Sequence, residues 1–254
     1  MNSLPVATVL ASIFILSSPA SGASLDELIK LGDAKAHQYQ EEEALDHYLA
    51  AAKLDPTNAY LHVAISREYR HLMSDARADS EKLRLGKAAL SYAERAAALA
   101  PSDSHAQLAP AITYGKMLTL LTSNKDQLEA SKMIKVAADK AVALDPHNDL
   151  AWHILGRWHR GIAEVGGVKR MVGSLVYGKM PDSSYENAAA CFQRALALKP
   201  DRLMHYIELG HTYSKLGNPT EAARLIAQGL AMPETEKDDP ATKQRGRQVL
   251  KDLR

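Results

Sequence analysis

Small and large apolar residues alternate in a fixed order ahead of several prolines. Two segments share a spacing of four, three and five residues: Ala44, Tyr48, Ala51 and Pro56, then Ala188, Phe192, Ala195 and Pro200. Residues at i, i+4 and i+7 lie on one face of an α-helix. Alanines on that face let a second helix approach closely around one aromatic ring. Because proline cannot continue the helix before it, the pattern predicts a helix and then a turn at each proline.

A second pattern indicates a partner helix for each of these. In two repeats a large residue is followed by Leu-Gly and then by another ring: Trp152, Leu155, Gly156 and His159, and Tyr206, Leu209, Gly210 and Tyr213. These positions match the signature of the tetratricopeptide repeat, a hairpin of two helices. We therefore expect an all-α, tetratricopeptide-like α-solenoid of about five hairpins over residues 24–236. A polar C-terminal capping helix is expected within residues 237–254, because a solenoid needs its open end closed.

The repeats are unequal in length. Pro56, Pro101 and Pro146 lie 45 residues apart, which is 11 more than the standard repeat of 34. Eleven residues make close to three helical turns, so such an insertion lengthens a hairpin without rotating its apolar face. Pro146 and Pro200 lie 54 residues apart, and glycines interrupt the added stretch. We expect an insertion at residues 161–184 that is a loop with at most a short helix, and a candidate site.

Residues 1–23 differ in composition from the rest. No charged side chain occurs before Asp26, and the mostly apolar run Leu4–Leu16 is followed by small, turn-forming residues. This is typical of a secretory signal peptide cut after Gly22 or Ala23, although no Lys or Arg precedes the run. The run is shorter than the ~20 residues of a membrane-spanning helix. We expect cleavage and export, with a retained N-terminal anchor as the alternative.

Composition and motifs argue against catalysis. The formal net charge of +1 provides no global field for nucleic acid, and we expect no such partner. The single Cys191 excludes a multi-cysteine metal site. The stretch from Gly173 to Lys179 reproduces the start of a phosphate-binding loop, but Met180 stands where a hydroxyl should bind magnesium, and Pro181 follows. We expect a protein that is not an enzyme and that has no cofactor and no metal.

Basic residues concentrate on the predicted first helices, which line the concave side of such a solenoid. Lys116 and His71 belong to this set, and the candidate ligand-binding residues are Arg67, Arg70, Trp152, His153, Arg157, Arg160, Lys169, Arg170, His211 and Lys215. One hypothesis is a groove for an anionic partner, either an acidic peptide tail or a lipid headgroup. The alternative is that the arginines pair with Asp or Glu of neighbouring helices.

Three segments around the fourth repeat are similar to a known family. They are Ala151-Trp-His-Ile-Leu-Gly-Arg-Trp158, Met180-Pro-Asp-Ser-Ser-Tyr-Glu-Asn187 and Ala190-Cys-Phe-Gln-Arg-Ala195. The chain resembles the regulators of microtubule dynamics, closely over about the last hundred residues. The resemblance implies a tetratricopeptide-like, non-enzymatic protein. Members are associated with microtubule or spindle-pole binding, and one membrane-anchored member with organelle tethering and lipid transfer.

Two functions stay open. The first is a binding scaffold for an acidic protein or peptide partner, tubulin-like by the family resemblance. The second is a lipid-binding, lipid-transfer or membrane-tethering module with an apolar cavity for an anionic lipid. An open polar groove favours the first, and a closed apolar cavity favours the second. Localisation differs too: a cleaved signal exports the protein to the periplasm or the medium, whereas microtubule association needs a membrane-anchored or cytoplasmic protein.

Overall fold

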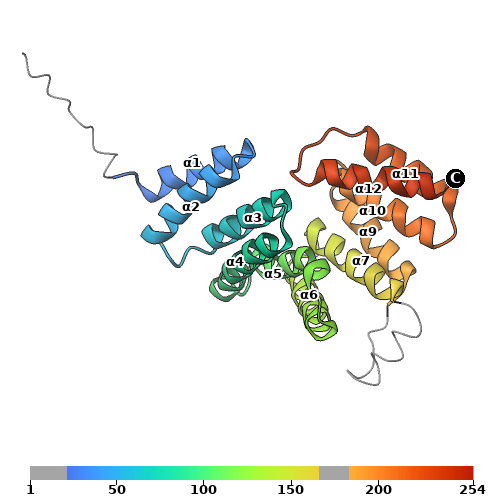
Figure 1. The fold of residues 1–254 in the computed structure, drawn as a ribbon, viewed down its shortest axis with the longest axis horizontal. Coiled ribbons are helices and arrows are strands. Elements are labelled where there is room, and N and C mark those ends of the chain that lie inside the picture. The colour runs from blue at the N-terminus through green and yellow to red at the C-terminus, as the bar shows by residue number, and fades with distance from the viewer. Residues whose placement is uncertain (1–21, 166–182, 254) are drawn as a thin grey trace, which may run out of the picture.

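The computed structural model describes residues 22–165 and 183–253, which form helices with no β-strand among them (Figure 1). The helices in chain order are α1 (Leu25–His37), α2 (Glu41–Leu54), α3 (Ala59–Asp75), α4 (Asp79–Leu99), α5 (Ser104–Met117), the 3-10 turn η1 (Leu118–Leu120), α6 (Asn124–Leu144), α7 (Asp149–Glu164), α9 (Tyr185–Leu198), α10 (Leu203–Lys215), α11 (Pro219–Ala231) and α12 (Asp239–Asp252). Consecutive helices pack against each other along the chain. The predicted all-α, tetratricopeptide-like solenoid is confirmed.

Short polar side chains fix the turns between hairpins. Asn58, Asp103 and Asn148 each precede a first helix and accept a backbone N–H from the residue three positions later. Asp55 and Asp145 accept the backbone N–H two residues later, across the intervening proline. Because loss of an N-cap costs about 1 kcal/mol, these residues specify where each first helix begins.

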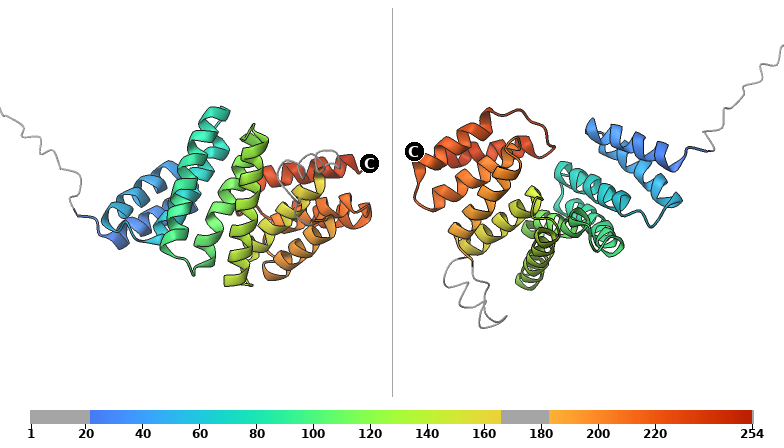
Figure 2. Two further views of the ribbon diagram at one scale, coloured as in Figure 1. Left: turned by 90° about the horizontal axis from the view of Figure 1, so that it is seen from below. Right: turned by 180° about the vertical axis from the view of Figure 1, so that it is seen from behind.

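The hairpins stack into a curved superhelix (Figures 1 and 2). The first helices α3, α5, α7 and α10 contact one another in that order and form the inner, concave face. The second helices α4, α6, α9 and α11 lie on the outside. The α1–α2 hairpin forms one end, and α12 packs on α10 and α11 at the other. Inner-face side chains therefore come from α3, α5, α7 and α10.

The large–small spacing seen in the sequence is a helix contact in the structure. The fully buried rings of Tyr48 and Phe192 lie directly over Gly32 and Gly156 of the preceding helices. A Cβ added at Gly32 would lie 2.6 Å from the Tyr48 ring, and one at Gly156 would lie 2.8 Å from the Phe192 ring. Each ring therefore needs a glycine opposite it, which is why the repeat signature pairs the two positions.

Longer helices account for the longer repeats. α4 and α6 have 21 residues each, whereas α2 and α9 have 14. The added turns keep the apolar face in register, since Ala89, Ala93 and Ala96 of α4 are all fully buried. The lengthening predicted for the second and third repeats is thus located mainly in their outer helices.

Residues 161–164, where the insertion was predicted to begin, are helical. α7 continues through Gly161 and ends at Glu164. A glycine inside a helix costs about 1 kcal/mol relative to alanine, and burial of Ile162 against the core around Trp158 offsets that cost. Residues 166–182 lie outside the described residues. They include Lys169, Arg170 and the segment from Gly173 to Lys179, so the loop expected there stays a prediction.

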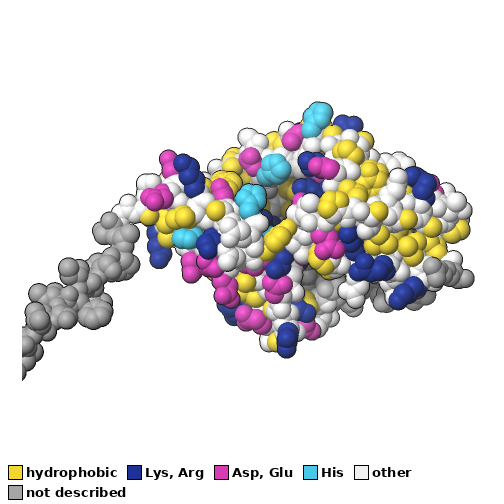
Figure 3. All heavy atoms as spheres, turned by 90° about the horizontal axis from the view of Figure 1, so that it is seen from above, with side chains coloured by type: hydrophobic (Ala, Val, Ile, Leu, Met, Phe, Trp, Pro, Cys, Tyr) yellow, Lys and Arg dark blue, Asp and Glu magenta, His cyan; other side chains and the backbone are white. Residues whose placement is uncertain are grey.

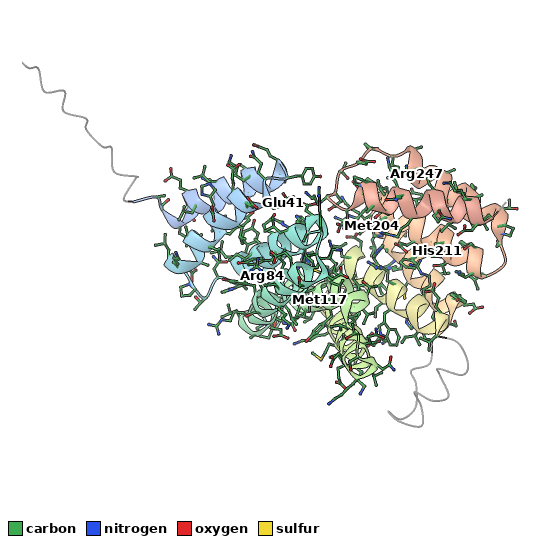
Figure 4. All side chains as sticks on the ribbon, in the orientation of Figure 1. Glu41, Arg84, Met117, Met204, His211 and Arg247 are labelled. Carbon is green, nitrogen blue, oxygen red and sulfur yellow. The ribbon has the colours of Figure 1, made fainter. Side chains whose placement is uncertain are left out.

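The structure describes the C-terminal helix but not the N-terminal segment. Residues 1–21 lie outside it, so export stays a prediction. Across residues 22–165 and 183–253, no helix combines the length and apolar character needed to cross a bilayer. At the other end, α12 begins at Asp239 and buries Thr242, Gly246 and Val249, while Arg247 on its opposite face is exposed (Figure 4). A polar helix therefore covers the last hairpin.

Candidate functional site on the inner face

The inner face brings together most of the predicted binding residues. Viewed from the side on which α1 and α12 lie, the surface is hollowed between the two halves, with histidine, basic and acidic side chains around the hollow (Figure 3). α3 supplies Arg67 and Arg70, and α10 supplies Lys215 and also His211, which is labelled in Figure 4. The remaining described candidates are on α7: Trp152, His153, Arg157 and Arg160.

A buried acid, Glu208, lies beneath Arg160 of α7 and Arg245 of α12 and was not among the predicted site residues. The Glu208 side chain is 3% exposed and accepts hydrogen bonds from Arg160 Nη2 and, at 3.2 Å, from Arg245 Nη2 of α12. Burial alone would raise the pKa of Glu208, but the Arg160, Arg157 and Arg245 guanidiniums hold that pKa well below its usual range. Glu208 is therefore an anion that neutralises part of the inner face.

α3 holds a second internal pair. Glu68 is buried, and its carboxylate accepts a hydrogen bond from Arg67 Nε at 2.7 Å and lies 3.5 Å from His71 Nδ1. Arg70 is buried and donates to Ser66 Oγ at 2.8 Å. Burial lowers the pKa of Arg70 to about 10. Arg67 and Arg160 thus follow the alternative hypothesis of pairing with acids, and Arg70 is a core residue rather than a groove side chain.

His153 is also a core residue and not a groove side chain. It is 4% exposed, and its Nδ1 lies 3.0 Å from His205 Nδ1 of the next repeat. His205 Nε2 in turn lies 2.9 Å from Asp149 Oδ2. His153 and His205 lie 52 residues apart on different helices, so spacing along a single helix does not pair them. The half-buried Trp152 uses its Nε1 to donate to the Pro146 carbonyl at 2.9 Å, which fixes a turn.

His153 and His211 predict that the folded protein loses stability as pH falls from about 6.5 toward 4.5. Burial lowers the pKa of His153 well below its usual value and that of His211 to about 4. Both rings bind protons in the unfolded chain but not in the folded one, so the free energy of unfolding falls as pH drops below about 6.5. His211 alone contributes about 1–2 kcal/mol after solvent screening is allowed for.

Urea unfolding at pH 7.0 and at pH 4.8 measures this loss. His211→Asn should remove part of the difference between the two pH values. His37→Asn, at the exposed end of α1, is the matched control and should leave the difference unchanged. Equal stability of the wild-type protein at both pH values would contradict the prediction.

Arg157 remains as an unpaired cation on this face. It is exposed, and none of the described residues forms an ion pair or hydrogen bond with its guanidinium. Desolvation by the surrounding protein lowers the Arg157 pKa; Glu208 opposes this effect, and Arg160 and Arg245 add to it. Lys215 on α10 is likewise exposed. The inner face therefore presents unneutralised positive charge at its centre.

Comparison with known proteins identifies the chain. The family model for "Regulator of microtubule dynamics protein 1-3" matches residues 28–254. The chain belongs to the regulator of microtubule dynamics family. Regulator of microtubule dynamics protein 1 of Rattus norvegicus is 28% identical over 130 residues, covering 51% of this chain and 42% of the rat protein. Regulator of microtubule dynamics protein 3 of Xenopus laevis is 24% identical over 114 residues, covering 44% and 25%. The aligned part thus spans less than half of these family members.

Solved structures support the fold assigned to this family member. A thermophilic TPR protein of Thermus thermophilus superposes with a TM-score of 0.62, at 17% identity, over 89% of this chain and 99% of its own. The MamA protein of Desulfovibrio magneticus RS-1 gives a TM-score of 0.52 at 15% identity, over 83% and 96%. At these identities the likeness concerns the fold alone.

Proposed function

We propose that this family member is a non-enzymatic binding scaffold whose inner face takes an acidic segment of a protein partner, with Arg157 as its anchor. The exposed, unpaired guanidinium of Arg157 is the observation that carries the proposal. A guanidinium presents parallel N–H donors that match a carboxylate, so a Glu or Asp side chain is its natural partner. Arg245 and Lys215 extend the positive surface across α12 and α10.

The polarity of the inner face favours a peptide over a lipid chain. It exposes Arg157 and Lys215 and buries Glu68, Thr113, Glu208 and Thr212 beneath them, all of them polar. Lipid tails need an apolar lining, because unpaired polar groups are costly against hydrocarbon. The polar lining therefore supports a scaffold, and the family name supports tubulin, whose C-terminal tails are acidic, as the class of partner to test first.

Charge reversal at Arg157 tests its role as the anchor for the acidic segment. Arg157→Glu should weaken binding of a fluorescein-labelled, glutamate-rich tubulin-tail peptide at least about 20-fold, because repulsion replaces a charge-assisted hydrogen bond. It should also flatten the dependence of the dissociation constant on salt. Arg157 forms no hydrogen bond or ion pair with the described residues, and Glu208 keeps Arg160 and Arg245 as its direct partners when Arg157 is replaced. Fluorescence anisotropy titrations measure both effects.

Arg84→Glu is the matched charge reversal on the outer helix α4, where Arg84 pairs with Glu81 of the same helix (Figure 4). It should change peptide affinity less than about twofold, since this pair lies on the solvated surface. Equal affinities of the wild-type and Arg157→Glu proteins for the peptide would contradict the proposal. Binding to anionic vesicles without any binding to the peptide would favour the lipid-binding alternative instead.

A further inference from the structure

The segment between α11 and α12 reaches across the opening of the superhelix. This connector, Met232–Asp238, extends from the last hairpin toward the turn between α1 and α2 (Figure 1). The Tyr39 hydroxyl in that turn donates to the Thr235 carbonyl at 2.8 Å. Residues almost two hundred positions apart in the chain therefore meet, and the connector bridges the two ends of the solenoid.

Ion pairs continue this bridge along α2, α3 and α5. Lys237 Nζ lies 2.8 Å from Glu41 Oε1 and 2.9 Å from Asp75 Oδ2. Asp238 Oδ2 accepts from Lys116 Nζ at 2.8 Å. Lys116 lies on the same inner face as Arg157, whose positive charge contributes to lowering the Lys116 pKa after desolvation by burial. The Asp238 carboxylate thus already pairs with Lys116, one of the cations of the proposed binding face.

Tyr39 holds a backbone conformation that a glycine holds at the matching position of the last hairpin. Its φ is +55°, and it is the one non-glycine residue with positive φ among the described residues. Tyr39 follows Gly32 by seven residues, as Gly217 (φ +74°) follows Gly210 in the last hairpin. A side chain at this position strains the backbone. Strain at a residue that contacts the connector points to a role for that contact.

The bridge is weak on one side and firm on the other. Its contacts to α2, α3 and α5 are polar, and two of the three acids are largely solvated: the Asp75 and Asp238 side chains are 53% and 47% exposed, whereas Glu41 is 8% exposed. Exposed ion pairs contribute little and are screened by salt. On the other side, the buried Asp239 accepts the backbone N–H groups of Thr235 and Glu236 at 2.8 Å each and fixes the start of α12. The connector can therefore detach from the first hairpins while α12 stays in place.

We propose that the connector is an ionic clasp that closes the superhelix and is displaced by the acidic partner, whose carboxylate replaces that of Asp238 at Lys116. The inference rests on the proposed function for the identity of the partner. A protein that binds only in its open form has an affinity reduced by the fraction of molecules that are open. Loosening the clasp should therefore tighten peptide binding without adding any contact.

Distance measurements test the clasp without any ligand. Spin labels at Gln38→Cys and Glu234→Cys, both exposed, report the gap between the α1–α2 turn and the connector. Cys191 is buried, and burial raises its thiol pKa to about 11, so it should stay unlabelled. We expect one short distance at low salt and a longer, broader distribution at about 1 M salt, where the Debye length is ~3 Å.

Charge removal gives the second measurement. Lys237→Ala/Asp238→Asn should lengthen the label distance at low salt and tighten binding of the glutamate-rich peptide about 5- to 10-fold. Lys251→Ala/Asp252→Asn removes the same two charges from the exposed end of α12 and should change neither value. Label distances that respond neither to salt nor to the variant would overturn the clasp, and opening without a gain in affinity would overturn the competition at Lys116. Opening with no peptide binding in any form would instead overturn the proposed function and leave the clasp standing.

Discussion

Replacement of Glu208 by Gln is expected to lower the free energy of unfolding by about 3–5 kcal/mol. Glutamine preserves the shape of the side chain but removes the negative charge. The guanidiniums of Arg160 and Arg245, which contact this carboxylate, then lose their counter-charge, and Arg160 is only 11% exposed. Removing one partner of a buried pair costs far more than the pair itself contributes, because the other charge stays desolvated.

Urea unfolding followed by circular dichroism measures this loss, and the melting temperature should fall by roughly 6–20 °C. Glu221→Gln removes the same charge from an exposed pair with Arg224 on α11 and should have no measurable effect. Adding Arg160→Met to Glu208→Gln should restore part of the stability, because it removes the uncompensated buried charge. A Glu208→Gln protein as stable as wild type would contradict the assignment of Glu208 as the counter-ion of the inner face.

The architecture was predictable because each repeat encodes its own hairpin. The spacing of Tyr48 and Phe192 relative to their alanines sets a helix face, and the prolines and Asx residues set the turns. These are local interactions, so they recur with the sequence period. The extension of α7 past Gly161 was not predicted, because the burial that offsets the cost of a glycine depends on the neighbouring helix α6.

The charges of the site were only half predictable. The register placed Arg157 and Lys215 on the inner face, and the structure leaves both exposed. The register did not predict that Glu208 lies beneath Arg160. Nor did it predict that Lys116 pairs with Asp238, which is 122 residues later in the chain. Such pairs depend on how neighbouring hairpins are rotated and how far the superhelix curves. The sequence of a single repeat determines neither the rotation nor the curvature. Counting basic residues on the predicted inner face therefore overestimates the unpaired positive charge.

Replacement of Phe192 by Ala is expected to lower the free energy of unfolding by about 3–5 kcal/mol. Its ring is fully buried between α7 and α10 and packs edge-to-face with the His153 ring, with ring centroids 5.3 Å apart. The Arg160 guanidinium lies over the Phe192 ring, 5.7 Å from its centroid. Removal of the ring leaves a cavity that helices on both sides hold open, so little relaxation is available to recover the loss.

A double-mutant cycle with Gly156 tests whether this ring is the reason for the glycine. Gly156→Ala should destabilise the wild-type protein by about 1–3 kcal/mol, because the new Cβ overlaps the Phe192 ring. In the Phe192→Ala background the same change should be neutral or stabilising by up to about 1 kcal/mol, since alanine favours the helix. Gly161→Ala, on the same helix with no atom within 4 Å of the added Cβ, is the matched control and should be mildly stabilising in both backgrounds. If Gly156→Ala had the same effect in both backgrounds, the coupling would be zero, and close packing of Phe192 would not explain the glycine of the repeat signature.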